Sequence, residues 1–358
     1  MDTLIGFSFR TWGTLLRENR FRISSQYWRR AAFVTLMSLM NSRGKCREEK
    51  RYGAQIAQAT VQPPLFVLGH WRSGTTLLHS LLALDEQFAY PNLFEVTHPL
   101  TFLVREALVE AHMAQSEAEK RHMDNMQVTF RSPGEDEAAL AVLSLRSPLL
   151  GWLFPRREDY YDRFLSFHEA DPRDVTRWKN ALRLFLQKLS WRYNKPVLLK
   201  SPHHTARVRL LLEMFPDARF VHIYRNPYEV FQSTQKLYAT AVPQSYLQSP
   251  NSTDQTVGIL RRYTTMYDAF FAERPLIPSG QFCEVAFEEL ERDMVGVLER
   301  VYAQLNLPGF AAAQPAIAQY AAQTAGYKKN SHTRLAEPLG RQVAQAWRRN
   351  FERWGYGI

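Results

Sequence analysis

The chain contains little cysteine and no long apolar run. Of its 358 residues only Cys46 and Cys283 are cysteines, which argues against a disulfide framework and favours a reducing compartment. The N-terminal region lacks an extended apolar stretch, so we expect no secretory signal and predict a cytoplasmic location. Internal repeats and low-complexity segments are also absent. What remains is a globular protein of ordinary composition, 45% hydrophobic and 22% charged.

Acidic residues are fewer than basic ones, 35 against 45, so the formal net charge is +10. A basic surface suits nucleic acid, an anionic membrane or a polyanionic small ligand equally well. The length allows one large α/β domain or two small ones, each with an ample core. The charge therefore indicates an anionic partner without choosing among the three classes.

Residues 1–62 are predicted to form a helical N-terminal extension. Their most apolar run, Ala31 to Met40, is about half of the ~20 residues that a membrane span needs. Arginine and lysine residues flank this run on both sides. An apolar helix between basic clusters can lie on an anionic membrane surface, which would make the protein membrane-associated. We prefer the alternative that the helix packs on the rest of the chain, or on a second subunit of a homo-oligomer.

The stretch from Pro63 to Leu84 has the pattern of a strand, a loop and a helix. Leu65 to Leu68 predict a short buried strand, and apolar residues at helical spacing follow the loop. The backbone N–H groups of such a loop, together with the helix N-terminus, bind anions. The spacing Gly69-x4-Gly74 is that of a Walker A loop, but Thr75 stands where that loop has lysine.

The cation of this loop is Arg72, which Ser73 follows, and Thr75 and Thr76 open the helix. A loop that moves a γ-phosphoryl group uses lysine and Mg²⁺ because a triphosphate carries dense charge. A sulfuryl group carries less charge, so fixed N–H groups and an arginine or lysine can replace the metal. A simpler alternative is an ordinary turn followed by a helix that Ser73 or Thr75 caps.

Short apolar strands alternate with helices further along the chain, which predicts an α/β fold with a central parallel sheet flanked by helices. One strand, Val197 to Leu199, leads into the polar segment Lys200 to His204, and another, Arg219 to Tyr224, ends at Arg225. Ligands of such sheets lie at the carboxyl ends of strands. We therefore expect the loop at Gly69, the polar segment and Arg225 to converge.

The sequence Arg-Ser-Gly-Thr-Thr at positions 72–76 resembles the 5′-phosphosulfate loop of sulfotransferases that use 3′-phosphoadenosine 5′-phosphosulfate (PAPS). Arg225, with Ser233 eight residues later, resembles the second signature of that family, in which the two side chains hold the 3′-phosphate. Residues 282–290 are similar to the family's later strand and Glu-Glu-Leu helix start. Residues 326–332 resemble its late basic loop, which closes over the cofactor. The similarity covers residues 63–358 and is greatest to the bacterial soluble group.

The resemblance implies a P-loop-like three-layer fold, a sulfotransferase domain at 63–358, PAPS as co-substrate and no required metal. It also implies cofactor-binding roles for Arg72, Ser73, Gly74, Thr75, Thr76, Arg225, Ser233, Tyr327, Lys328 and Asn330.

In the implied reaction an acceptor hydroxyl or amine attacks sulfur in line, and 3′,5′-ADP leaves. Cations are needed at the oxygens that gain charge, and Arg72 and Lys200 are the candidates. The preferred base is Glu95, at the end of a predicted strand from Ala89, where some family members place a catalytic glutamate. His204 is the close alternative.

Other bases remain open. His203 neighbours His204, and both follow the lysine at a longer spacing than the Lys-x-His pair of the cytosolic enzymes. Glu135, Asp136 and Glu137 precede an apolar helix, and they either favour its dipole or face the substrate.

Two other functions remain as alternatives, a metal-dependent P-loop nucleotide kinase and a non-catalytic nucleotide-binding or nucleic-acid-binding module. Thr75 and the lack of a clear Walker B aspartate argue against the kinase. The absence of interleaved aromatic and basic residues argues against single-strand binding, so we expect no nucleic-acid partner. The acceptor, whether a small molecule, a lipid or a sugar, is not identified by the sequence. The apolar extension and the aromatic segment 152–167 favour a hydrophobic or amphipathic one.

Overall fold

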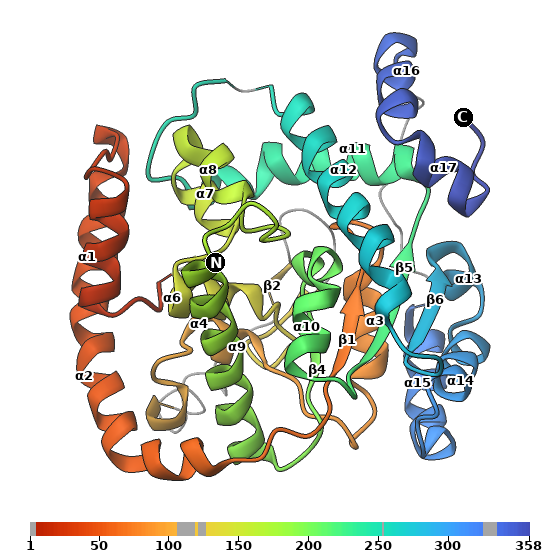
Figure 1. Cartoon of the computed structure of the whole chain (residues 1–358), viewed down its shortest axis with the longest axis horizontal. Coiled ribbons are helices and arrows are strands. Elements are labelled where there is room, and N and C mark those ends of the chain that lie inside the picture. Colours follow the sequence, from red (N-terminus) through yellow and green to blue (C-terminus); the bar gives the residue numbers. More distant parts are fainter. Residues whose placement is uncertain (1–4, 106–118, 121–126, 253, 325–334) are drawn as a thin grey trace. The chain divides into compact units, whose positions relative to one another are not determined.

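The computed structural model describes residues 5–105, 119–120, 127–252, 254–324 and 335–358. The chain divides into two compact units, and Figure 1 labels most of their helices and strands. The helical unit comprises Met1–Val61, Pro91–Asn194 and Thr240–Thr253, and the sheet unit comprises Gln62–Tyr90, Lys195–Ala239 and Asp254–Ile358. The division of the chain into domains at residues 62 and 63 stays a prediction.

In its described residues the helical unit contains mostly helices and one short antiparallel strand pair. Its elements are α1 (Phe9–Glu18), η1 (Ser25–Tyr27), α2 (Trp28–Gln58), α4 (Leu93–Thr97), β2 (Glu119–Lys120), β3 (Gln127–Val128), α6 (Glu137–Ser144), α7 (Leu149–Leu153), η2 (Pro155–Arg157), α8 (Glu158–Asp162), α9 (Pro172–Tyr193) and η4 (Val242–Ser245).

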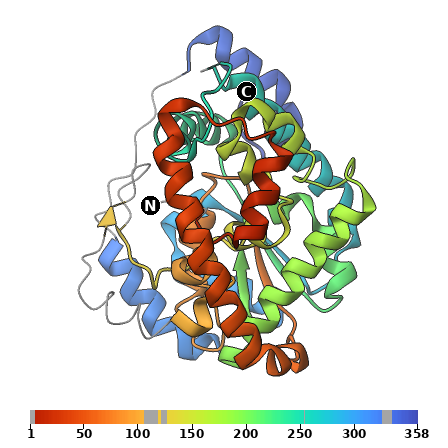
Figure 2. The same cartoon turned by 90° about the vertical axis from the view of Figure 1, so that its left-hand side faces the viewer.

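The long helix α2 packs against α1 and α9 within this unit (Figure 2). Its buried side recurs every three or four residues, at Ala31, Val34, Ser38 and Asn41 among others, as an amphipathic helix requires. The preferred interpretation of the extension, packing on the rest of the chain, is therefore confirmed for one face of α2. None of the helices in the described ranges is both long enough and apolar enough to cross a membrane.

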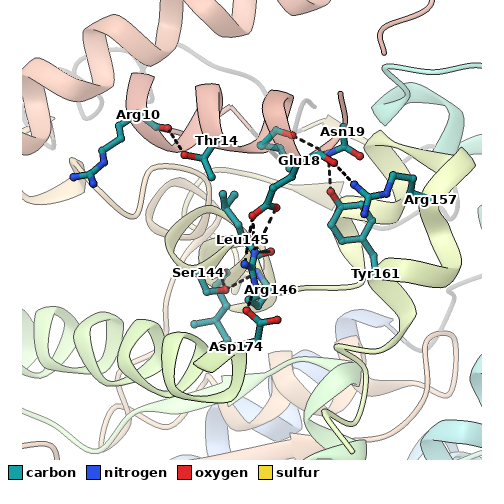
Figure 3. A network of polar contacts seen from close by, with 12 residues as sticks. Arg10, Thr14, Glu18, Asn19, Ser144, Leu145, Arg146, Arg157, Tyr161 and Asp174 are labelled. Atoms are coloured by element: carbon teal, nitrogen blue, oxygen red, sulfur yellow. Dashed lines mark hydrogen bonds and ion pairs between the residues drawn. The ribbon is translucent and has the colours of Figure 1, made fainter. Parts of the chain in front are cut away.

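A polar network joins three segments of the helical unit (Figure 3). Arg146 is 6% exposed and pairs with Glu18 of α1 at 3.3 Å and with Asp174 of α9. Nearby, Asn19 donates a hydrogen bond of 2.7 Å to the Tyr161 hydroxyl. Most of the aromatic residues between 152 and 167 are buried in this unit, so they serve core packing.

The sheet unit contains a four-stranded parallel sheet in the order β4-β1-β5-β6. Its elements are β1 (Leu65–Leu68), α3 (Thr75–Leu82), β4 (Leu198–Lys200), η3 (Pro202–Ala206), α10 (Val208–Met214), β5 (Arg219–Tyr224), α11 (Pro227–Thr240), α12 (Thr256–Glu273), η5 (Arg274–Leu276), β6 (Phe282–Ala286), α13 (Phe287–Arg292), α14 (Met294–Gln304), α15 (Phe310–Thr324), α16 (Glu337–Ala346) and α17 (Arg348–Trp354).

Both faces of this sheet are covered. Successive strand residues point to opposite faces, so Val67 and Val221 face the core formed with α3, α14 and α15. Phe66 and Phe220 point the other way and stack at 5.5 Å, and on the same face His222 stacks on Phe270 of α12 at 4.3 Å. The predicted three-layer arrangement of a parallel sheet between helices is confirmed.

The predicted strand from Ala89 to Glu95 is wrong. Ala89 makes only an isolated bridge to Val197, and Glu95 lies in helix α4. The Asn92 side chain accepts from the Glu95 N–H at 2.9 Å, and the Glu95 carboxylate accepts from the Asn92 N–H at 2.8 Å. This reciprocal capping box starts a helix and outweighs the strand propensity of the neighbouring aromatic residues.

Candidate cofactor and active site

The loop between β1 and α3 requires glycine at both ends. Gly69 has φ +139°, and a Cβ there would lie 2.4 Å from the Ile223 carbonyl oxygen. Gly74 has φ +100°, and a Cβ there would lie 2.3 Å from the Phe287 ring. Arg72 also has a positive φ, 70°. The close approaches place the loop directly against β5 and the start of α13.

The N-terminus of α3 has the features of an anion site. Gly74 is the N-cap, so no side chain caps the helix. The Ser73 hydroxyl donates instead to the His70 carbonyl at 2.8 Å, and the helix begins at Thr75. The first N–H groups of a helix have no intrahelical acceptor. The alternative of a helix capped by Ser73 or Thr75 is therefore wrong, and a helix start without a side-chain cap is of the kind that can bind an anion.

Two sequence signatures meet in side-chain contact. Arg72 Nε, from the loop, donates a hydrogen bond of 2.8 Å to the hydroxyl of Ser233, in α11. Arg225, which follows β5, donates to the Arg72 carbonyl at 3.5 Å. Residues separated by about 150 positions in the sequence are thus neighbours at the carboxyl ends of β1 and β5, as the sheet order predicted.

Arg225 is held by a ring and by one carboxylate. Its guanidinium lies 4.3 Å from the centre of the Phe287 ring, and it pairs with Glu229, one helical turn further on. Its Nε is buried and has no hydrogen-bond partner among the residues that the structure describes. The guanidinium therefore keeps donor capacity, although the Glu229 carboxylate already occupies one of its terminal nitrogens.

The loop is also held from the opposite face of the sheet. The Gly69 N–H donates to the Thr205 hydroxyl of η3 at 2.7 Å, and the His70 N–H donates to the Tyr267 hydroxyl of α12 at 3.3 Å. Burial lowers the pKa of His70 to about 3, so this imidazole is neutral at physiological pH. These contacts fix the backbone of the loop at its first two residues.

The segment after β4 lies beside the same loop. His203 meets Trp71 edge to face at 4.7 Å, and His204 meets Phe66 at 5.2 Å. Lys200 is 2% exposed and stands opposite Val67 at the end of β4. The expected meeting of the loop, the Lys200–His204 segment and Arg225 is confirmed, and their catalytic roles stay predictions.

Sequence reasoning missed three residues of this region. Thr205 holds the loop. Glu229 pairs with Arg225 four residues away, a spacing that places two side chains side by side on a helix, so this pair could have been predicted from the sequence. His79, on α3, is 1% exposed; burial lowers its pKa well below the ordinary value, and the charge of Lys200 lowers it further. A single histidine on an apolar helix gives no comparable signal.

Glu95 lies in the helical unit and is fully buried. Besides the capping box, its carboxylate accepts a hydrogen bond of 2.8 Å from the Tyr193 hydroxyl, and Arg192 lies 3.4 Å away. Burial raises the pKa of Glu95, and the Asn92 N–H, Arg192 and Tyr193 oppose that shift. Burial of this kind favours a base, while the hydrogen bonds also give Glu95 a structural role.

The remaining candidates divide into two groups. Asp136 and Glu137 are buried at the start of α6, and Glu135 is partly buried. Tyr327, Lys328 and Asn330, the predicted residues of the late basic loop, lie outside the described residues.

In the described parts of the chain, no three histidine, cysteine, aspartate or glutamate side chains gather as a metal ion would require.

The sheet unit also has a cavity of about 570 Å³ that lies away from the loop at Gly69. Its lining residues are Phe271, Arg274, Pro275, Ile277, Pro278, Ser279, Gly280, Phe282, Arg349 and Arg353. Most of these residues lie between the end of α12 and the start of β6, at the amino end of that strand, whereas the loop follows the carboxyl end of β1. In a parallel sheet these are opposite edges, so this cavity is not the predicted cofactor site.

Comparison with known proteins identifies the family. A model of the sulfotransferase family matches residues 63–312. The chain is 34% identical over 353 residues, 98% of this chain and 90% of the relative, to the omega-hydroxy-beta-dihydromenaquinone-9 sulfotransferase Stf3 of Mycobacterium bovis, and equally to that of Mycobacterium tuberculosis.

Two solved structures share the fold. Sulfotransferase STF9 from Mycobacterium avium aligns with a TM-score of 0.67 at 19% identity, covering 99% of this chain and 98% of that one. Sulfotransferase STF1 from M. tuberculosis aligns with a TM-score of 0.60 at 20% identity, covering 88% and 86%. The chain therefore belongs to the PAPS-dependent sulfotransferase family that its two signatures indicated, and it is an enzyme that transfers sulfuryl groups.

Proposed function

We propose that the protein transfers the sulfuryl group of PAPS to a hydroxyl of a lipid-like acceptor and releases 3′,5′-ADP. The observation that carries this proposal is the hydrogen bond between Arg72 and Ser233, which joins the two signature segments. In the reaction the acceptor oxygen forms a bond to sulfur while the bond from sulfur to the phosphate oxygen breaks. The acceptor proton passes to a base of the protein.

Each of the two signatures is proposed to bind a different part of PAPS. Ser73, Gly74, Thr75 and Thr76 hold the 5′-phosphosulfate at the uncapped start of α3, through backbone N–H groups and the two threonine hydroxyls. Arg72 neutralises charge on the leaving phosphate, and Lys200 is the second cation. Fixed donors aimed at oxygens that gain charge stabilise the transition state without reorganisation.

Arg225 and Ser233 hold the 3′-phosphate. The buried Nε of Arg225, which lacks a partner in the described chain, supports this role. Tyr327, Lys328 and Asn330 are proposed to cover the nucleotide. We propose that no metal is required, because these cations and N–H groups supply the charge compensation.

The base is proposed to be Glu95, with His204 as the alternative. Burial raises the pKa of Glu95, which brings a carboxylate closer to the range of a general base. His204 lies beside β1, in the same unit as the loop. His203 and the carboxylates 135–137 follow as candidates.

The names of two relatives support our proposal for the acceptor class. The Stf3 proteins are named for a menaquinone derivative that bears an ω-hydroxyl, a lipid-like molecule. We propose a hydroxylated lipid-like acceptor for this chain as well, taken up at the cytoplasmic side of a membrane. Assembly into a homo-oligomer is a further proposal.

General-base catalysis contributes roughly 10²–10⁴-fold to a rate. We therefore expect Glu95→Gln to lower turnover by that order with PAPS affinity nearly intact, and His204→Asn to do less. The measurement is release of 3′,5′-ADP from PAPS with a water-soluble phenol as surrogate acceptor.

The control for the structural role of Glu95 is Asn92→Ala, which breaks the capping box and keeps the carboxylate. Equal losses in Glu95→Gln and Asn92→Ala would assign Glu95 to helix capping. A loss in His204→Asn alone would transfer the role of base to His204. Full turnover in all three would direct attention to Glu135–Glu137.

A further inference from the structure

Helix α2 has a second, solvent-facing side that is apolar at its centre. Phe33, Leu36, Leu39 and Met40 are 48%, 59%, 43% and 48% exposed. Phe33, Leu36 and Met40 follow one another at intervals of three and four residues, so they share one face of the helix. The opposite face, with Val34 and Ser38, is the side that packs inside the helical unit.

Basic residues continue this line in both directions. Arg29 precedes Phe33 by four residues, and Arg43 and Arg47 follow Met40 at steps of three and four, all exposed. The acidic residues of α2 lie off this line, since Glu48 is buried and Glu49 pairs with Lys45. We call the exposed residues Arg29, Phe33, Leu36, Met40, Arg43 and Arg47 the α2 stripe.

We propose that the α2 stripe binds the surface of an anionic lipid bilayer, with α2 lying in the membrane plane. A helix whose apolar side chains enter the boundary between headgroups and acyl chains, with arginines beside anionic headgroups, binds in this way. The proposal rests on the proposed function in one respect, because a lipid-like acceptor is itself held in a bilayer.

The arginines at the ends of the α2 stripe favour a bilayer over a second copy of this chain as the partner. In a twofold-symmetric dimer the same patch faces itself. With arginines at both ends of the stripe, parallel and antiparallel pairing each bring like charges together. An anionic surface instead neutralises both ends while the centre is buried.

The test is flotation of the full-length protein with vesicles of phosphatidylcholine alone or mixed with phosphatidylglycerol. We expect binding to the anionic vesicles, loss of binding as salt screens the arginines, and little binding to neutral vesicles. Binding that is absent, or equal on both vesicle types, would overturn the proposal.

Two variant sets separate the stripe from general surface properties. Leu36→Glu/Met40→Glu should abolish flotation, while Leu184→Glu/Val257→Glu, at exposed apolar residues elsewhere, should not. Arg29→Gln/Arg43→Gln/Arg47→Gln should weaken binding about 100-fold, since each cation near an anionic surface contributes about fivefold. Arg173→Gln/Arg177→Gln/Arg183→Gln, exposed on α9, removes the same charge and should weaken it far less.

Equal losses in the α2 and control sets would contradict the proposal. Sedimentation provides the alternative outcome. If the wild type forms a dimer but does not bind vesicles, and Leu36→Glu/Met40→Glu dissociates that dimer, the stripe is assigned to contact with a second copy instead. Turnover of the water-soluble phenol should stay unchanged in all stripe variants, which confirms their folding. Vesicle binding by a wild-type protein without sulfotransferase activity would defeat the proposed function and leave this inference standing.

Discussion

Two arginines, one in each unit, show how differently this chain uses the same side chain. Arg146 of the helical unit is nearly buried and is paired with two carboxylates and the Leu145 carbonyl (Figure 3). Burial by itself would lower the pKa of Arg146, but Asp174 and Glu18 outweigh burial and raise it. Arg225 of the sheet unit has one half-exposed carboxylate, the Arg72 carbonyl at 3.5 Å, an aromatic ring and a buried Nε without a partner in the described residues.

The difference separates structure from ligand binding. An arginine whose three guanidinium nitrogens are all hydrogen-bonded to the protein joins the segments around it and is poorly suited to bind a ligand. An arginine with spare donors costs stability unless a ligand completes its hydrogen bonds. Arg146 is therefore expected to affect folding, and Arg225 to affect nucleotide binding.

The largest effect is expected for Arg146→Met. Removing one partner of a buried pair leaves the other charges uncompensated and costs about 3–5 kcal/mol. The free energy of unfolding, measured in denaturant, should fall by that amount. Arg300→Met removes an arginine from an exposed pair with Glu289 and should cost ~1 kcal/mol or less. If the two variants lost similar unfolding free energy, the structural role that we assign to Arg146 would be contradicted.

Arg225→Ala should have the opposite profile. We expect affinity for 3′,5′-ADP to fall by about 2–5 kcal/mol, because the phosphate loses a charge-assisted partner. The unfolding free energy should change little, since the lost pair with Glu229 is half exposed. Calorimetric titration of the nucleotide measures the first quantity, with Arg300→Ala as control. Unchanged affinity, or a loss explained by unfolding, would contradict the assignment.

A smaller effect is expected for Glu229→Gln. The Glu229 carboxylate occupies the guanidinium that the 3′-phosphate is proposed to bind, so the nucleotide must displace it. An exposed ion pair is worth roughly 0.2–1 kcal/mol, so removing the competing charge should tighten 3′,5′-ADP binding by a factor of about 1.4 to 5. Glu213→Gln, in the exposed pair with Arg209 at the same spacing, is the matched control. Weaker binding in Glu229→Gln would show that Glu229 orients Arg225 instead of competing with the ligand.

Much of the sheet unit followed from the sequence. Buried parallel strands are short apolar runs bounded by glycine, proline or charge, and β1 and β5 have that form. The positions of Arg72 and Arg225 at strand ends followed from the same pattern. The hydrogen bond between Arg72 and Ser233 did not, because side-chain geometry across 161 residues leaves no periodic signal.

The neighbourhood of Glu95 shows the opposite case. The spacing of Asn92 and Glu95 is that of a capping box, a readable signal, but the aromatic and apolar residues around it favoured a strand. The exposed apolar side of α2 could not be predicted from the sequence, for a different reason. Its apolar run belongs to two faces of one helix, and only packing shows which face is covered.

Titration of 3′,5′-ADP into the wild-type protein in the presence of a chelator tests the central claim most directly. Our account predicts binding that the chelator leaves unchanged and that Arg225→Ala weakens, with no comparable binding of ATP–Mg²⁺. Loss of nucleotide binding on chelation, or preference for ATP–Mg²⁺, would contradict it and favour a metal-dependent nucleotide site.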